Sequence, residues 1–205
     1  MGIADTSIAA AAAALSGVAA FASWRSSREA NATAASVAQI ERDRWHRELT
    51  PQLRLRVDAN QQMVYVRFDS PAALKRLQVW LHVRDDRDRS EDPVLGAGPT
   101  AAQRAEVIWG PYSFRRGTDG VMAGARSAGP YRLDAQDMTR VGIEPSLRPT
   151  WMEGTNGEER WRSDYRTASM RLWVDCEAEG HKPWRLSFEL PFDGSWAETG
   201  AIGTL

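Results

Sequence analysis

Two repeats of apolar and polar positions divide the chain near Pro51. Residues 25–49 contain no glycine or proline and are rich in helix formers, so we expect a helix that continues from an apolar run at residues 8–24. Pro51 ends this helix, because proline disfavours the α conformation of the residue before it. After Pro51 apolar residues recur at every second position, the repeat of a strand with one buried face.

The alternation predicts six strands, with a seventh near residues 129–143. The six stretches are 53–57, 64–68, 77–83, 105–116, 170–176 and 184–190. Short antiparallel strands joined by polar turns are typical of a β-sandwich. We therefore predict a mainly β fold, an immunoglobulin-like β-sandwich of about seven strands preceded by a long N-terminal α-helix.

This pattern predicts three parts along the chain. Residues 1–24 form an apolar helix, residues 25–50 continue it as a helical stalk, and residues 51–205 form the sandwich. Two long connections, 85–104 and 117–168, interrupt the sandwich. Because long connections in compact domains usually serve binding, a local function is expected there.

The apolar run 8–24 predicts a single-pass membrane anchor. It carries no charged residue and has about the minimum length for a helix that crosses hydrocarbon. Trp24 lies where an interfacial aromatic residue belongs, and Arg25 and Arg28 follow it. Because no Lys or Arg precedes the run, the positive-inside rule places the C-terminal domain in the cytoplasm. The lipid bilayer is thus one expected partner.

Two other interpretations of the same segment remain open. A secretory signal peptide normally begins with basic residues, whereas Asp5 is the charged residue that precedes this run. A soluble alanine-rich helix that oligomerises is the second alternative. The stalk supports self-association through Val37, Ile40 and Trp45, which are spaced widely among polar residues.

Charge and cysteine content exclude several partners and sites. The 26 basic and 27 acidic residues nearly cancel, so no long-range field attracts nucleic acid. Cys176 is the single cysteine, which excludes an intramolecular disulfide and a zinc site of several cysteines. Its position in strand 170–176 predicts a buried thiol.

No pattern of residues predicts catalysis, a cofactor or a metal. The three histidines, His46, His82 and His181, fall on the stalk, a strand and a turn, without metal-ligand spacing. The acidic run 86–92 lacks the turn glycine and terminal glutamate of a calcium loop, and its arginines would repel a cation. The sequence therefore predicts a protein that is not an enzyme, with no catalytic, cofactor-binding or metal-binding residues.

Nine tryptophans are the most unusual feature of the composition. Strand parity turns Trp184 toward the core, whereas Trp80 and Trp173 face outward. Either the segment 117–168 covers these two, or they form an aromatic surface for a glycan, peptide or partner. Trp161 and Tyr165 stand four residues apart, a spacing that puts both on one face of a short helix. The candidate ligand or partner face comprises Trp80, Trp173, Trp151, Trp161 and Tyr165.

Three short stretches resemble uncharacterised actinobacterial proteins that have an N-terminal, membrane-anchor-like helix and a C-terminal β-sandwich domain. They are residues 44–51 (RWHRELTP), 161–165 (WRSDY) and 179–184 (EGHKPW). The resemblance covers most of the chain through these short motifs. It implies the same architecture and no particular activity.

The sequence predicts a membrane-anchored β-sandwich that binds or scaffolds through its long connections and outer aromatic face. A carbohydrate-binding module is the first alternative, and it requires coplanar exposed aromatic side chains. An enzyme would instead require a cleft that brings carboxylates together. Candidates for such a cleft are Asp134, Asp137, Glu144, Glu158 and Asp164.

Overall fold

The computed structural model describes residues 3–86, 98–152, 156–199 and 202–203, and for residues 3–20, 22 and 202–203 it describes the backbone. By its internal contacts the chain divides into two compact units, Met1–Glu48 and Leu49–Leu205.

The first unit is one helix, α1 (Ile3–Glu48). Ion pairs one turn apart support it, with Arg25 Nε 3.1 Å from Glu29 Oε1 and Arg44 Nε 2.8 Å from Glu48 Oε1. No helix within the described residues is long and apolar enough to cross a membrane. Most side chains of the run 8–24 lie outside the described part, so the membrane anchor stays a prediction.

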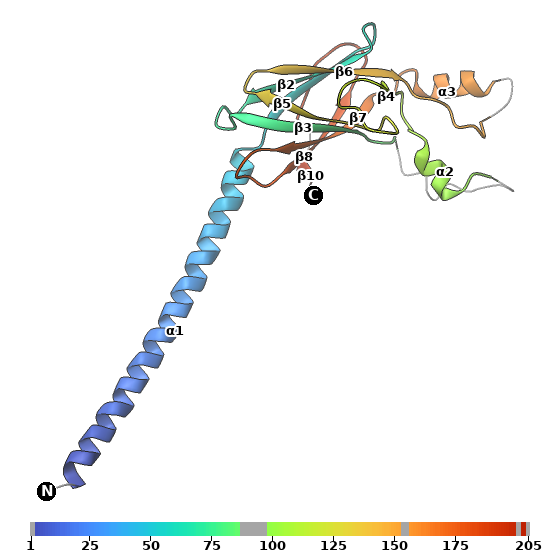
Figure 1. Cartoon of the computed structure of the whole chain (residues 1–205). Coiled ribbons are helices and arrows are strands. Elements are labelled where there is room, and N and C mark those ends of the chain that lie inside the picture. The colour runs from blue at the N-terminus through green and yellow to red at the C-terminus, as the bar shows by residue number, and fades with distance from the viewer. Residues whose placement is uncertain (1–2, 87–97, 153–155, 200–201, 204–205) are drawn as a thin grey trace. The chain divides into compact units, whose positions relative to one another are not determined.

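The second unit is a sandwich of two antiparallel sheets, to which the described residues contribute ten strands (Figure 1). The strand bounds are β1 (Gln52–Asp58), β2 (Met63–Ser70), β3 (Arg76–Val83), β4 (Tyr112–Phe114), β5 (Ser127–Asp134), β6 (Met138–Pro145), β7 (Met170–Glu177), β8 (Trp184–Leu190), β9 (Ala197–Glu198) and β10 (Ile202–Gly203).

Seven of the ten strands have neighbours like those of an immunoglobulin sandwich, while β5, β9 and β10 are additional. The first sheet has the order β4-β6-β2-β1-β9, and the second has the order β10-β8-β7-β3-β5. The neighbours β1, β2, β6 and β4 correspond to strands A, B, E and D of that fold, and β3, β7 and β8 correspond to C, F and G. The predicted mainly β sandwich with an N-terminal helix is therefore confirmed.

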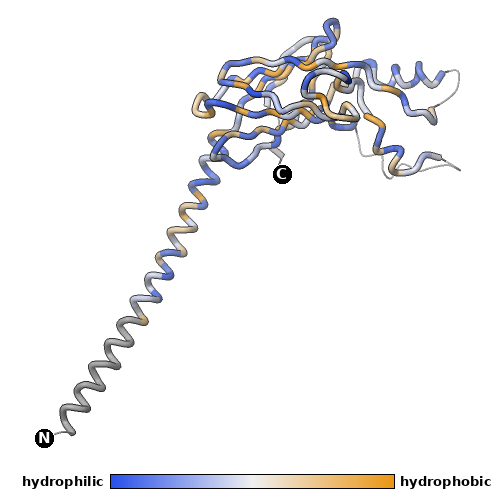
Figure 2. The backbone as a smooth tube through the Cα atoms, viewed as in Figure 1, coloured by the Kyte–Doolittle hydropathy of each residue, from blue (hydrophilic) through white to orange (hydrophobic). Residues whose placement is uncertain are grey.

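Inward side chains of the two sheets meet in one apolar core. Buried residues alternate with half-buried or exposed ones along β1, β3, β7 and β8, as the sequence pattern predicted. Figure 2 shows this alternation as a change of colour along the strands. The largest fully buried side chains include Trp184, Phe68, Phe114 and Phe188. Cys176 also lies in this core, where burial raises the pKa of its thiol.

The expected strand over 105–116 is wrong for most of its length. A short helix, α2 (Ala101–Glu106), comes first, and only β4 pairs with a neighbouring strand. The helix begins because Thr100 and Gln103 form a capping box, each side chain bonding the other residue's backbone N–H. Pro111 lies between the helix and β4.

Residues 117–168 are more ordered than the predicted long connection. They contain β5, β6 and a second helix, α3 (Gly157–Tyr165), where a single strand near 129–143 was expected. Gly129 and Pro130 break the alternation within β5. In β6 three consecutive residues are buried, so its pattern is not that of a strand with one exposed face.

Candidate functional site

Two long connections meet at one end of the sandwich and form an annex, defined here as α2, α3 and residues 107–111 and 146–152 (Figure 1). Its centre is a small aromatic cluster of Trp109, Trp161 and Tyr165. The ring centroids of Trp161 and Tyr165 are 4.8 Å apart, and those of Trp109 and Trp161 are 5.7 Å apart. Contacts of this kind stabilise aromatic clusters beyond simple burial.

Hydrogen bonds from the indole groups fix this cluster to the surrounding backbone. Trp161 Nε1 donates to the carbonyl oxygen of Ser146 at 3.2 Å, and the Ser146 hydroxyl donates to the carbonyl of Gly110. Trp109 Nε1 donates to the carbonyl of Arg104 at 3.1 Å. The polar atoms of both indoles are thus satisfied although the rings are buried.

Arg126 joins α2 to the edge of the second sheet. Its Nη1 lies 3.1 Å from Asp85 Oδ1, and its Nη2 donates to the carbonyl of Ala105 at 3.0 Å. Asp85 Oδ1 also accepts the backbone N–H of Trp109 at 2.9 Å. One guanidinium and one carboxylate therefore position Ala105 and Trp109 beside the second sheet.

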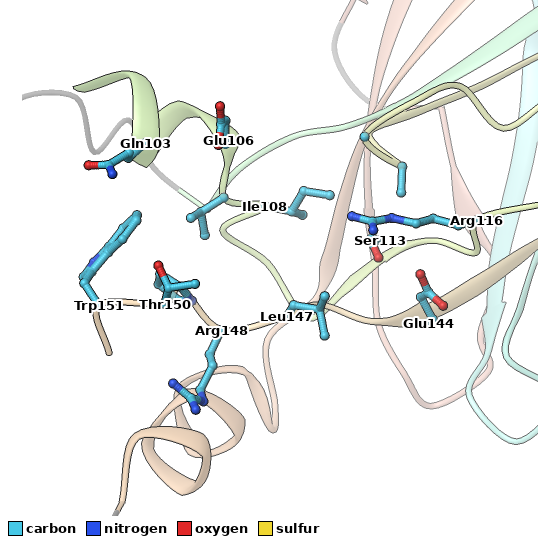
Figure 3. Close-up of a pocket in the computed structure, with 14 residues that line it drawn as sticks. Gln103, Glu106, Ile108, Ser113, Arg116, Glu144, Leu147, Arg148, Thr150 and Trp151 are labelled. Atoms are coloured by element: carbon cyan, nitrogen blue, oxygen red, sulfur yellow. The ribbon is translucent and has the colours of Figure 1, made fainter. Parts of the chain in front are cut away.

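A first pocket of about 280 Å³ lies between the annex and neighbouring residues of the first sheet, among them Ser113 on β4 and Glu144 on β6. Trp151 and Gln103 lie at one end of it, and Arg116 and Glu144 lie at the other (Figure 3). Ile108 stands between the two ends. The lining therefore combines apolar side chains with both signs of charge, the mixture expected of a recognition site.

A second pocket, of about 890 Å³, adjoins the first. Arg116, Glu144 and Leu147 line both pockets. Leu147 is 76% exposed, which is the largest exposed fraction of any large apolar side chain among the described residues. Trp161 and Phe192 contribute aromatic walls to the second pocket. Leu147 thus lies beside the aromatic walls of the second pocket and beside the apolar lining of the first.

The structure brings together only part of the predicted ligand face. Trp151, Trp161 and Tyr165 meet in the annex, where Trp161 is only 3% exposed and Trp151 is half-buried. Both Trp161 and Tyr165 lie on α3, as their spacing indicated. Trp80 and Trp173 lie elsewhere, on the outer face of the second sheet.

Trp80 and Trp173 do not form an open aromatic surface. Both are half-buried, and the Arg84 guanidinium lies over the Trp173 ring at 5.0 Å. Arg84 and Arg171 share the Glu189 carboxylate, each with an N–O distance of 3.1 Å. A charged side chain thus covers Trp173, and the aromatic rings of the annex cluster with Trp109 instead.

A hydrogen-bonded chain of Ser127, His82 and Asp175 crosses the same outer face. Ser127 Oγ is 2.8 Å from His82 Nδ1, and Asp175 Oδ2 is 3.2 Å from His82 Nε2. Arg185 binds both oxygens of Asp175, at 2.7 and 2.6 Å. The residue types are those of a nucleophile, base and orienting acid. The carboxylate that contacts His82 is thus also held by a bidentate pair with Arg185.

The carboxylates considered for catalysis lie in different parts of the second unit. Glu144 and Glu158 both line the second pocket. Glu158 is held by Arg148 Nε at 3.2 Å and by Arg162 Nε at 2.9 Å. Asp134 is the last residue of β5, and Asp137 lies in the turn between β5 and β6.

Candidate metal ligands stay apart in the part of the chain that is described. No group of three His, Cys, Asp or Glu side chains there has the arrangement of a metal site. His46 lies on α1, and the His82 ring is hydrogen-bonded to Ser127. The ring centroids of His181 and Trp184 are 5.7 Å apart. Most of the acidic run 86–92 lies outside the described residues.

Sequence reasoning missed Trp109, Arg116 and the partners of His82. Trp109 could not be recognised because it lay in an expected strand. The alternation along β3 and β7 could have identified His82 and Asp175 as outward-facing residues, since both lie on the same face of the sheet as Trp80. Ser127 lies beside His82 because β3 pairs with β5. This pairing joins residues far apart in the chain, so no local sequence pattern predicts it.

No protein-family model matches this sequence, and comparisons with curated proteins and with solved structures give no significant match. The resemblance to actinobacterial proteins therefore stays a prediction. The functional argument depends on the geometry of the chain itself.

Proposed function

We propose that this protein is a non-catalytic binding or scaffolding module that holds a segment of another protein at its annex. One observation carries the proposal: the exposed Leu147 stands between two adjoining pockets of about 280 and 890 Å³. Connections at one end of an immunoglobulin-like sandwich commonly serve as its binding surface.

The lining supports a protein segment over a small polar metabolite. Trp151 and Ile108 provide apolar contact area in the first pocket, and Trp161 and Phe192 do so in the second. Arg116 and Glu144 offer opposite charges at the junction of the two pockets. An apolar anchor ringed by polar groups is the usual composition of a protein interface.

The proposal of a non-catalytic role is supported by the polar groups of the second sheet. The Ser127 and His82 pair leads to a carboxylate that is also held by a bidentate pair with Arg185. A functional triad depends on a carboxylate that is free to stabilise the imidazolium.

The membrane anchor over residues 8–24 and the cytoplasmic side of the second unit belong to the same proposal. They are supported by the uncharged run and by Arg25 and Arg28 behind it. Fractionation with protease protection of the second unit tests both. A partner of the annex would then be held at the membrane surface.

Photocrosslinking at Leu147 tests the binding role. A p-benzoylphenylalanine at this position, in cells of the natural host, is expected to form a protein adduct. The same residue in place of Lys75, in the turn between β2 and β3 at the other end of the sandwich, is the control. Once the partner is purified, Leu147→Ser is expected to lower its affinity about tenfold, since a central apolar anchor is lost.

Two results would contradict the proposal. Equal adduct formation at Lys75 would mean that the annex is not a specific surface, as would unchanged affinity in Leu147→Ser. Labelling of Ser127 by a fluorophosphonate, abolished in His82→Ala, would show a hydrolase in place of a binding module.

A further inference from the structure

The outer face of the first sheet carries two rows of arginines. One row across the strands contains Arg54, Arg67 and Met138, and the next contains Arg56, Tyr65 and Arg140. All six point outward, because they alternate with the core residues of β1, β2 and β6. These rows share no residue with the annex or with the outer face of the second sheet, although Glu144, farther along β6 on the same face, lines both pockets.

The carboxylates near these rows do not balance the arginines. Arg54 and Arg67 share Asp69, with Arg54 Nη2 3.2 Å from Oδ1 and Arg67 Nε 2.9 Å from the same oxygen. Glu198 lies opposite Arg54 on β9. Four arginines against three carboxylates on or beside the rows, Asp58, Asp69 and Glu198, leave an excess of one positive charge.

Two arginines lack a carboxylate partner among the described residues. The Arg56 guanidinium lies 5.0 Å from the Tyr65 ring and 5.0 Å from the Trp196 ring. Stacking between two rings holds this cation in place without neutralising it. Arg140 is exposed and forms no hydrogen bond or ion pair within the described part of the chain. On the second sheet, by contrast, Arg84, Arg171 and Arg185 all pair with carboxylates.

We infer that this arginine face binds an acidic, extended segment of a protein partner. Alternate residues of an extended chain are about 6.8 Å apart, the same spacing as Arg54 and Arg56 on β1. A segment with an acidic residue at every second position therefore presents carboxylates at the repeat of the arginines. Guanidinium groups held by stacking bind carboxylates with little loss of side-chain freedom.

Other anionic partners fit this face less well. Single-stranded nucleic acid binds by stacking bases on exposed rings, whereas Tyr65 is only 9% exposed and Arg56 covers both rings. An interfacial lipid site needs apolar side chains that enter the bilayer, and Met138 is the one exposed large apolar residue in these rows. Charge and shape together favour an acidic peptide.

Peptide binding by the full-length protein tests the inference. The probe is a fluorescein-labelled decapeptide of alternating Glu and Ser, and the matched peptide has Gln in place of Glu. Polarisation at about 0.05 M salt is expected to show saturable binding of the Glu peptide only. Arg140→Gln and Arg56→Gln are each expected to weaken it about fivefold. Arg132→Gln, an exposed arginine on β5 of the second sheet, is the control and should leave binding unchanged.

The inference fails if the Gln peptide binds as tightly as the Glu peptide, or if Arg132→Gln weakens binding as much as Arg140→Gln. It also fails if the Glu peptide does not bind while phosphatidylglycerol vesicles or a single-stranded oligonucleotide bind in an Arg140-dependent way. Since Arg140 is exposed and forms no hydrogen bond among the described residues, its replacement leaves the fold intact.

Discussion

The sandwich and the annex belong to one compact unit but are stabilised in different ways. The sandwich buries apolar side chains from two sheets in one continuous cluster. The annex depends on three aromatic side chains and on a few hydrogen bonds to the backbone. Its helices are short, and isolated helices of this length are not stable in water.

This difference separates stability from recognition. Many core residues can lose a contact without loss of the sheets, whereas the annex depends on Trp109 and Trp161. Regions with few buried contacts open locally at lower free energy than the core does. The annex can therefore open locally while the sandwich stays folded, which suits the binding role proposed for it.

The largest effect is expected from a truncation within the sandwich. Phe68→Ala removes a fully buried ring between the sheets and should lower the free energy of unfolding by about 4 kcal/mol. Urea denaturation measures this loss. Alkylation of the buried Cys176 by iodoacetamide provides an independent readout, because burial raises the thiol pKa and blocks access.

Leu147→Ala is the control for this truncation and should change stability by less than about 0.5 kcal/mol, since the side chain is exposed. Similar alkylation rates in Phe68→Ala and the unaltered protein would show that the two-sheet core is not the main source of stability.

A smaller and local effect is expected in the annex. Trp161→Ala removes the ring that contacts Trp109 and Tyr165, at a local cost of about 3 kcal/mol. Hydrogen exchange should accelerate in α2 and α3 and stay slow in β1 and β7. Trp161→Phe keeps the ring contacts and loses only the bond to Ser146, so its effect should be weaker. Simultaneous exchange of the strands would mean that annex and sandwich unfold together.

The smallest effect concerns the outer face of the sandwich and depends on pH. The hydrogen bond from Arg54 lowers the pKa of Asp69, and the Arg54 and Arg67 charges act in the same direction. Because the folded pKa lies below the unfolded value of about 3.9, the stabilisation is complete above that pH and disappears as the pH falls through the folded pKa.

Asp69→Asn should therefore lower the free energy of unfolding by less than about 1 kcal/mol at neutral pH. At a pH below the folded pKa of Asp69, the same substitution should leave the free energy of unfolding unchanged. Urea denaturation at neutral pH and below about pH 3 measures the difference. Glu179→Gln, in an exposed turn, is the control and should show no such pH dependence. If Asp69→Asn lowered the free energy of unfolding equally at both pH values, the pairing of Asp69 with Arg54 and Arg67 would not be the source of the pH dependence.

The sequence predicted the strands that have one buried face. The alternation around Leu55, Val66, Leu81 and Val174 follows from local chemistry, so β1, β2, β3 and β7 could be recognised. The capping box at Thr100 was an available signal for α2, but the apolar residues after it suggested a strand. β6 escaped because its buried residues are consecutive.

The candidate site was less predictable because it depends on distant residues. Parity correctly turned Trp80 and Trp173 outward, yet it could not show that Arg84 covers one of them. The meeting of Trp109 with Trp161 requires two connections that are far apart in sequence. The arginine rows likewise arise from the register of three strands, which no local pattern specifies.

The final strands have a consequence for biosynthesis. β9 pairs with β1 in the first sheet, and β10 pairs with β8 in the second. During translation β1, already paired with β2, lacks its second neighbour until residues 197–198 emerge from the ribosome. In the same way β8, already paired with β7, lacks its second neighbour until residues 202–203 emerge. Until then a nascent chain exposes unpaired strand edges that attract chaperones or neighbouring chains. A second protein inserted directly after β8 would separate β9 and β10 from the sandwich and hinder their pairing with β1 and β8.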